Sequence, residues 1–577
     1  MQTQRIAFVI LSVVLVFAAA VPEARASASA ADAVFLGGNF YTANPRQPWA
    51  SAVAIQGDRI VYVGDETGVA EFVGPETAQH RLNGRLVLPG LTDAHTHPGM
   101  VARSVGSLSI GDAETREELM QAIAKTVESH PDRSVLLGGY WRNELFDERG
   151  PQKRDLDRIE STRPLILFDW WGHSLWANSK AFEMAGVDRN TPDVIPGLAY
   201  YQRDESGEPT GWVTESAASA FANHFMTKTS EIEASLLAFL EYLRNLGVTT
   251  LFDAGNFGWD DEVYALISRW DREGVLPLRY HGSYTLFLPD DLPNAVAELK
   301  RMRKAYGSDR VRIDTLKVFL DGVIETRTAD MTEDYLDTPG NSGRSLLTQA
   351  QLRQLILDLH AEDLDMHVHT VGNQASKMTL NAVEEARKSL SEPLRTRVTL
   401  CHLETVDDSD FNRFKDLGVI ASFTPHWHGG DVANVLKLAI GDKARVQMRA
   451  QPLISDGAVF TFSSDITDES EWKADSANPY VGMQIGHNKQ AIEGGADATM
   501  APPRSERLRL DSLVDGYTRH AAFQLGRADQ LGTIEVGKRA DLVVLNRNLF
   551  EVARYDIHEV RPVAVWLDGK LVHGTLP

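Results

Sequence analysis

The chain has 577 residues, of which 24% are charged, and a formal net charge of −22. This acidity, without any long basic run, argues against binding to nucleic acid or to anionic membrane surfaces, and ordinary solubility explains it. The length is ample for one large catalytic domain and a smaller one. Cys401 is the only cysteine, so no intramolecular disulfide can form and stability must come from the core.

The N-terminus, residues 1–30, is typical of a signal peptide. An uncharged apolar run from Ile6 to Val21 is followed by the small-residue triplets Ala24-Arg25-Ala26 and Ala28-Ser29-Ala30. The run is shorter than the roughly 20 residues that span a bilayer, which disfavours an uncleaved anchor. We therefore expect export to the periplasm or the medium, and no membrane span after cleavage.

Two β-rich pieces lie at opposite ends of the chain. Residues 31–90 include a predicted hairpin with its turn at Gly57-Asp58, and residues 527–577 include another with its turn at Asp568-Gly569. Neither piece is large enough for a core of its own. We expect the two to pair into one small β-sandwich.

Between these ends, residues 91–526 alternate strand-like and helix-like segments. Eight strands are predicted, at 85–95, 248–254, 278–286, 312–320, 364–370, 397–403, 418–424 and 458–465. Eight parallel strands close a barrel, so the pattern predicts an α/β fold of the (β/α)8 TIM-barrel type. Capping boxes at Thr115 to Glu118 and Thr348 to Gln351, and the stretch from Ala375 to Leu390, indicate helices.

A large insertion is predicted after the first barrel strand, because residues 98–246 are too many for one crossover. It contains His173 and a group of large aromatic residues: Tyr140, Trp141, Trp170, Trp171, Trp176 and Trp212. Two interpretations stay open. The aromatic residues form a lid over an aromatic or acyl substrate, or they are ordinary core.

Three His-x-His pairs close apolar, strand-like runs, whereas chance placement of 17 histidines predicts fewer than one such pair. The pairs are His95 with His97, His367 with His369, and His426 with His428. Residues i and i+2 of a strand project to the same face, so each pair can offer two imidazoles to one point. Since neutral imidazole is a common ligand of zinc-like metals, the pattern predicts a metal site.

Catalytic groups of a (β/α)8 barrel lie at the C-terminal ends of its strands. Six candidate residues fall at such ends: His95, His97, Lys317, His369, His402 and Asp465. A hydrogen-bonded structural role explains any one of these histidines by itself, but the ordered set favours a shared metal site.

Lys317 and Asp465 each have two interpretations. Lys317 lies in an apolar strand, where it becomes a metal-bridging carbamate or pairs with Asp321 or Glu325. Asp465 binds metal and accepts a proton from bound water, or it caps a helix.

Longer motifs surround these residues, at Leu88 to His97, His369 to Gly372, Ser464-Asp465 and Gly532 to Leu542. With Lys317 and His402 they resemble the amidohydrolase superfamily over nearly the whole mature chain. Gly172-His173-Ser174, with Asn178 to Ala181, resembles the branch that contains N-substituted formamide deformylase. That branch usually has Asp where this chain has Asn373, so a charged role is not carried over to this position.

The resemblance implies two divalent metal ions, with zinc as the expected metal. His95, His97 and Asp465 are the implied ligands of the inner ion and His369 and His402 those of the outer ion, with carboxylated Lys317 and a hydroxide as bridges. The hydroxide would attack a metal-polarised carbonyl, and Asp465 would act as general base and acid by passing the proton to the leaving nitrogen. Asp93 is either a partner that orients these ligands or a turn residue.

Other candidates lie near this site. His367 points the same way as His369 but one layer deeper, and Cys401 is expected to pack rather than to act as a nucleophile. The candidate substrate-binding residues are His173, Trp176, His426 and His428, and a purely structural role is the alternative for His173.

The leading hypothesis is an exported metal-dependent hydrolase of a non-peptide carbon–nitrogen bond in a small-molecule amide, formamide or cyclic amide. The first alternative is hydrolysis of an ester, lactone or carbamate at the same site. The second is a non-catalytic binding or regulatory protein on the same barrel, against which the complete ligand set argues. The sequence leaves the substrate, and whether the chain forms a homo-oligomer, open.

Overall fold

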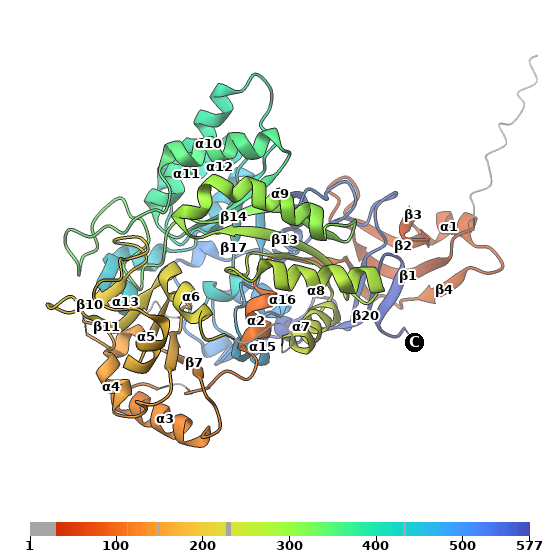
Figure 1. Ribbon diagram of the computed structural model, residues 1–577. Helices are drawn as coiled ribbons and strands as arrows, with labels where there is room; N and C mark the ends of the chain where they lie inside the picture. The colour runs from red at the N-terminus through yellow and green to blue at the C-terminus, as the bar shows by residue number, and fades with distance from the viewer. Residues whose placement is uncertain (1–29, 112, 148, 227–231, 431–433, 577) are drawn as a thin grey trace, which may run out of the picture.

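The computed structural model describes residues 30–111, 113–147, 149–226, 232–430 and 434–576 (Figure 1). The apolar run of the predicted signal peptide lies outside these residues, so export stays a prediction. Within the described ranges, every helix is too short or too polar to cross a bilayer.

The two ends of the chain share one eight-stranded sheet, in the order β21-β20-β19-β5-β1-β2-β3 with β4 beside β1. The antiparallel pairing of β5 with β19 joins the two ends. Phe35 and Trp566, from opposite ends of the chain, meet edge to face at 5.0 Å inside a common apolar core. The two ends therefore pair as expected, and their strands belong to a single sheet. The strands are β1 (Ala33–Tyr41), β2 (Trp49–Gln56), β3 (Arg59–Gly64), β4 (Ala78–Arg81), β5 (Leu86–Pro89), β19 (Leu542–Leu545), β20 (Pro562–Leu567) and β21 (Lys570–Gly574).

The eight predicted barrel strands are confirmed as one parallel sheet, in the order β18-β17-β16-β15-β14-β13-β12-β6. The predicted first strand is divided, because its first half is β5 of the terminal sheet and only its second half enters the barrel. Gly90 separates the halves, and a side chain there would meet Thr249 at 2.2 Å. The strands are β6 (Leu91–Thr96), β12 (Val248–Asp253), β13 (Arg279–Leu286), β14 (Val311–Phe319), β15 (Asp365–Thr370), β16 (Val398–His402), β17 (Ile420–Phe423) and β18 (Phe460–Phe462).

Helices cover the outside of the barrel, and their apolar faces fill the largest core of the molecule. The predicted helix at 375–390 is α11, and the capping boxes at Thr115 and Thr348 begin α3 and α10. The covering helices are α7 (Glu233–Asn245), α8 (Asp260–Glu273), α9 (Ala295–Tyr306), α10 (Gln349–Ala361), α11 (Asn373–Ser389), α12 (Phe411–Leu417), α14 (Ala450–Asp456), α17 (Leu510–Gly516) and α18 (Arg519–Gln524). Shorter or peripheral helices are α1 (Glu66–Val69), α2 (Pro98–Ser104), α13 (Asn434–Ile440), α15 (Glu469–Lys473) and α16 (Pro479–Asn488).

The insertion forms a separate five-stranded sheet, in the order β10-β11-β9-β8-β7. It lies on the opposite side of the barrel from the terminal sheet (Figure 1). Trp141 and Trp176 are fully buried in its own core, while Trp170 and Trp171 are exposed. Its elements are α3 (Arg116–Ser129), β7 (Leu136–Trp141), α4 (Lys153–Asp157), β8 (Leu165–Asp169), β9 (Ser174–Ala177), α5 (Ser179–Ala185), β10 (Tyr201–Arg203), β11 (Pro209–Thr214) and α6 (Glu215–Asn223).

Candidate metal centre

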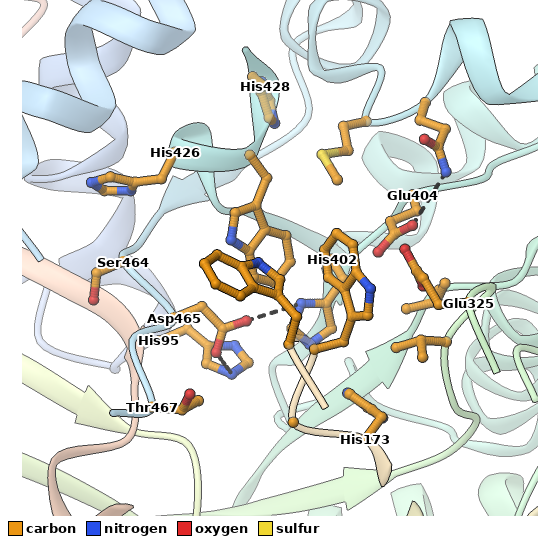
Figure 2. Close-up of a pocket in the computed structure, with 18 of the residues that line it drawn as sticks. His95, His173, Glu325, His402, Glu404, His426, His428, Ser464, Asp465 and Thr467 are labelled. Carbon is orange, nitrogen blue, oxygen red and sulfur yellow. Dashed lines mark hydrogen bonds and ion pairs between the residues drawn. The ribbon is translucent and has the colours of Figure 1, made fainter. Parts of the chain in front are cut away.

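The Asp465 carboxylate lies beside His95 and His402 at the C-terminal mouth of the barrel (Figure 2). Its Oδ1 is 3.4 Å from His95 Nε2 and 3.3 Å from His97 Nε2, and its Oδ2 is 3.3 Å from His402 Nδ1. Asp465 and His402 both have positive φ, 50° and 73°, a strained conformation that is typical of functional sites. Residues from the first, sixth and eighth barrel strands therefore meet at one carboxylate.

Hydrogen bonds behind the imidazoles fix which ring nitrogen faces Asp465. His97 Nδ1 lies 3.0 Å from the Gly255 carbonyl oxygen and must donate to it, which leaves Nε2 as the free acceptor. His95 Nδ1 lies 3.0 Å from His367 Nε2, so His95 also presents Nε2. Such partners orient metal-ligating histidines and set their tautomer.

His369 and His402 lie beside this group, with ring centroids 4.4 Å apart. His369 Nε2 is 3.2 Å from the Gly322 carbonyl oxygen and donates to it, which leaves Nδ1 unprotonated. Burial lowers the pKa of His369, His402 and His95 well below the ordinary value, with smaller contributions from neighbouring charges. These imidazoles are therefore neutral at physiological pH, which is the form that binds metal.

Lys317 lies under the cluster and is fully buried. Its Nζ is 3.3 Å from His95 Nε2 and 3.5 Å from Cys401 Sγ. Within the described residues it has no ion pair with Asp321 or Glu325, since Asp321 instead accepts backbone hydrogen bonds from Val371 and Gly372. The lysine therefore reaches the ligand cluster, while its carboxylation stays a prediction.

His367 and Cys401 form a deeper layer. Their ligand atoms and one of His95 lie within 4.8 Å of one another, which is a second grouping that could hold a metal ion. Cys401 Sγ donates to the Val368 carbonyl oxygen at 3.2 Å, and burial raises the pKa of this thiol to about 12. The Cys401 thiol is bonded to a backbone carbonyl oxygen and His367 Nε2 to His95 Nδ1, so we assign His367 to orienting His95 and Cys401 to packing.

Asp93 ties the first barrel strand to the last. Its carboxylate accepts hydrogen bonds from Ser464 Oγ at 2.6 Å, from the Ser464 amide at 3.1 Å and from the His95 amide at 3.3 Å. The Asp465 amide donates to the His95 carbonyl oxygen at 2.9 Å. In the described chain no regular ladder joins β6 to β18, so these bonds hold His95 and Asp465 in register across the seam of the barrel.

The donor set fits a zinc-like divalent ion. The ligand atoms of His95, His97 and Asp465 lie within 4.8 Å of one another. Neutral imidazoles with one carboxylate are the usual donors of catalytic zinc sites, which keep an open position for water or substrate.

A cavity of about 460 Å³ opens above this cluster. His173 of the insertion lines it, with Nδ1 2.7 Å from Glu215 Oε2 and its ring 5.5 Å from that of His369. Burial alone would lower the pKa of His173, but the Glu215 carboxylate outweighs it and raises the pKa to about 9. His173 is therefore placed as a cationic hydrogen-bond donor beside the predicted ligands.

The other predicted substrate residues divide into two groups. His426 and His428 line the cavity, on the short 3₁₀ helix Pro425–His428. Trp176 does not line it, because its side chain is buried in the core of the insertion beside Phe146. Trp170 and Trp171 line the cavity instead, as does Trp427. Trp170 lies three residues before His173 and Trp176 three residues after it, so nearness to this histidine in the sequence could not have distinguished them.

Four charged residues line the cavity without having been predicted as cavity residues: Glu325, Glu404, Glu471 and Lys489. No motif marks the segments that carry them, although Glu404 follows His402 by two residues. Asn373, where the resembling branch has Asp, donates to Thr332 and Asp407 and does not line the cavity. Its role is to hold the start of α11.

Comparison with known proteins agrees with this site. The model of a family described as "Amidohydrolase family" matches residues 82–573. The exoenzymes regulatory protein AepA of Pectobacterium carotovorum subsp. carotovorum is 30% identical over 405 residues, which are 69% of this chain and 86% of that protein. The N-substituted formamide deformylase of Arthrobacter pascens is 26% identical over 554 residues, which are 94% of this chain and 98% of that enzyme.

Among solved structures, an uncharacterized metal-dependent hydrolase from Pyrococcus furiosus superposes with a TM-score of 0.64 at 24% identity, over 90% of this chain and 100% of that one. At this identity the likeness shows the shared fold. The matched family spans far more than half of the sequence and includes every residue of the cluster around Asp465. The chain therefore belongs to the amidohydrolase family, and its barrel carries the site of a metal-dependent hydrolase.

Proposed function

We propose that this protein hydrolyses a non-peptide carbon–nitrogen bond in a small-molecule amide, formamide or cyclic amide. The observation that carries the proposal is the position of the Asp465 carboxylate, which lies 3.3–3.4 Å from three imidazole nitrogens at the floor of a substrate-sized cavity. The similarity to a formamide deformylase over 94% of the chain supports the same bond class.

Six residues of the chain would bind the metal. His95, His97, His369, His402 and Asp465 would hold the metal, with Lys317 beneath them. A divalent ion held there would polarise the substrate carbonyl and lower the pKa of the attacking water. Two ions, zinc as the metal and a carbamate on Lys317 complete the proposal.

Asp465 would move the proton. One carboxylate oxygen faces His95 and His97 and the other faces His402, so the group can take a proton from water on the cavity floor and release it on the substrate side. An amine leaves poorly unless its nitrogen is protonated, whereas an alcohol leaves more readily. A carboxylate placed for this transfer therefore favours cleavage of a carbon–nitrogen bond over ester hydrolysis.

His173 would position the carbonyl group. Its Nδ1 is fixed by Glu215, so Nε2 carries the hydrogen that faces the cavity beside His369. Glu215 in turn accepts a hydrogen bond from Thr328 Oγ1 at 2.6 Å, which connects the insertion to the loop after β14. The insertion thus contributes an oxygen-binding donor to the barrel site.

The 30% identity to a protein named for a regulatory role motivates a second candidate, a non-catalytic regulator on the same barrel. The intact ligand set and the acid–base carboxylate disfavour it, because a binding protein needs neither. We also propose that the protein is exported, on the strength of its N-terminal sequence.

A substrate panel tests the proposal. Zinc-loaded protein and an Asp465→Asn variant are incubated with N-substituted formamides, acyl anilides and the matching esters, and products are measured by liquid chromatography. We expect turnover of at least one nitrogen-linked series and none by the variant. Turnover of esters alone would replace the proposal with the esterase alternative, and no turnover of any series would favour the regulator.

A further inference from the structure

Lys489 is a buried cation without a partner in the cavity wall. It follows α16, is 2% exposed, and lines the cavity. Across the described residues, no hydrogen bond or ion pair reaches its ammonium group. Burial lowers the pKa of Lys489, and the Glu506 carboxylate, which lies beyond ion-pair distance, offsets this only in part. Burying an unpaired charge is costly, so a lysine in this position calls for a ligand of opposite charge.

His428 lies on the same part of the wall and is also without a partner. It is 2% exposed, and neither ring nitrogen forms a hydrogen bond within the described structure. Lys489 is the charge that acts on it most strongly. Gly429 lets the two segments touch, because a side chain there would meet the backbone of Gln490 at 2.7 Å.

The other charged groups of the cavity differ from this pair. His173 is bonded to Glu215, and Glu404 accepts a hydrogen bond from Gln447 at 3.2 Å. Glu325 and Glu404 face each other on a different part of the wall from His428 (Figure 2). Burial raises the pKa of Glu325 to about 7 and that of Glu404 well above its ordinary value. An anionic group entering the cavity would therefore meet little repulsion from these two acids and would be attracted to Lys489.

Trp427 connects the pair to the metal centre. It precedes His428, and its indole stacks on His402 with ring centroids 5.7 Å apart. A substrate whose scissile carbonyl lies over Asp465 can therefore extend along this indole to reach Lys489.

We propose that Lys489 and His428 form an anion subsite that takes a carboxylate of the substrate, remote from the bond that is hydrolysed. The carboxylate oxygens would accept hydrogen bonds from the Lys489 ammonium and from His428, whose ring nitrogens have no other partner. The substrate class is then an amide that carries a free carboxylate, such as an N-acyl amino acid. Assigning this carboxylate to the substrate rests on the proposed hydrolase function.

The first test measures binding without hydrolysis. Hexanoate and the neutral 1-hexanol are titrated calorimetrically into metal-loaded protein, its Lys489→Met variant and a Lys388→Met control, in which an exposed lysine of α11 is changed. We expect Lys489→Met to weaken hexanoate binding about 10- to 100-fold, which is the range of one charge-assisted hydrogen bond, and to leave hexanol binding unchanged. Lys388→Met should change neither. Equal hexanoate affinity in the parent and Lys489→Met would overturn the subsite.

Thermal unfolding separates a ligand-binding lysine from a structural one. Because Lys489→Met removes an unpaired buried charge, its melting temperature should equal or exceed that of the parent. A clearly lower melting temperature would show a structural role and would count against the subsite.

The second test uses turnover. Glutaric acid mono-4-nitroanilide is compared with its neutral carboxamide counterpart, and Lys489→Met should raise KM for the carboxylate substrate alone. Equal turnover of both anilides, insensitive to Lys489, would remove the subsite and leave the hydrolase function standing. No turnover of either, with hexanoate binding that still depends on Lys489, would remove the hydrolase function and leave the anion site.

Discussion

The two sides of the cavity are built in different ways. The floor consists of residues at strand ends, and buried hydrogen bonds such as those of Asp93 with Ser464 and His97 with Gly255 hold them. The opposite side consists of loops and the insertion, where Trp170 and Trp171 are 49% and 38% exposed. Groups that need fixed geometry lie on the rigid barrel, and groups that recognise a substrate lie on variable segments.

The largest expected effect comes from removing the proton carrier of the floor. Asp465→Asn keeps the size of the side chain but loses the charge and one of the two acceptor oxygens, so kcat should fall at least about 10²- to 10⁴-fold. Steady-state kinetics with metal analysis measure both roles of the residue. Asp416→Asn, at an exposed position of α12, is the control and should act like the parent. Near-normal kcat for Asp465→Asn would exclude Asp465 as the proton carrier.

Substitution of Lys317 tests whether a carbamate bridge between two metal ions lies beneath the ligands. If Lys317 carries a carbamate between two metals, Lys317→Ala should lose activity and most of one metal equivalent, and short carboxylic acids should restore part of both. Lys317→Arg should not restore activity or metal content, because it places a cation where an anion is required. A Lys317→Ala variant with two metals and normal turnover would mean that the lysine is structural.

Asp93 tests the seam that connects the two ends of the barrel sheet. Asp93→Ala leaves the Ser464 and His95 amides without their acceptor, so we expect metal affinity or kcat to fall about 10- to 100-fold with KM nearly unchanged. Asp93→Asn retains one acceptor oxygen and should recover part of the loss. If Asp93→Ala mainly raises KM, the residue acts on substrate rather than on the ligands.

The smallest effect on catalysis is expected from a substitution on the side of the cavity that consists of loops and the insertion. Trp171→Ala removes apolar contact area from the cavity mouth without touching the floor, so KM should rise about tenfold for bulky substrates while metal content stays constant. Small formamides should be hydrolysed almost as before. A loss of bound metal in this variant would contradict the division between floor and mouth.

The sequence allows correct prediction of the residues whose position follows from the strand pattern alone. His95, His369 and His402 follow apolar strands, and parallel strands bring their C-terminal ends together, so the cluster could be predicted. It does not allow prediction of residue positions that depend on packing between distant segments. Trp170 and Trp176 are both tryptophans of the insertion, and only the fold decides that one reaches the cavity while the other is core.

The same limit applies to the seam and to the loop side of the cavity. Asp93 could be a turn residue or a partner of the ligands, and only its contact with Ser464, 371 positions later in the chain, distinguishes the two. Lys489 and His428 are far apart in sequence, and neither belongs to a motif that predicts their meeting.

The most direct test of the metal-dependent site is removal and return of the metal. The purified protein is stripped with a chelator, its metal content and circular dichroism are recorded, and zinc is added back while hydrolysis of the best panel substrate is followed. We predict a folded but inactive stripped protein, whose activity returns in proportion to bound zinc and reaches its maximum at two equivalents. A folded, metal-free protein that hydrolyses this substrate at the original rate would contradict the assignment of the Asp465 cluster as a catalytic metal site.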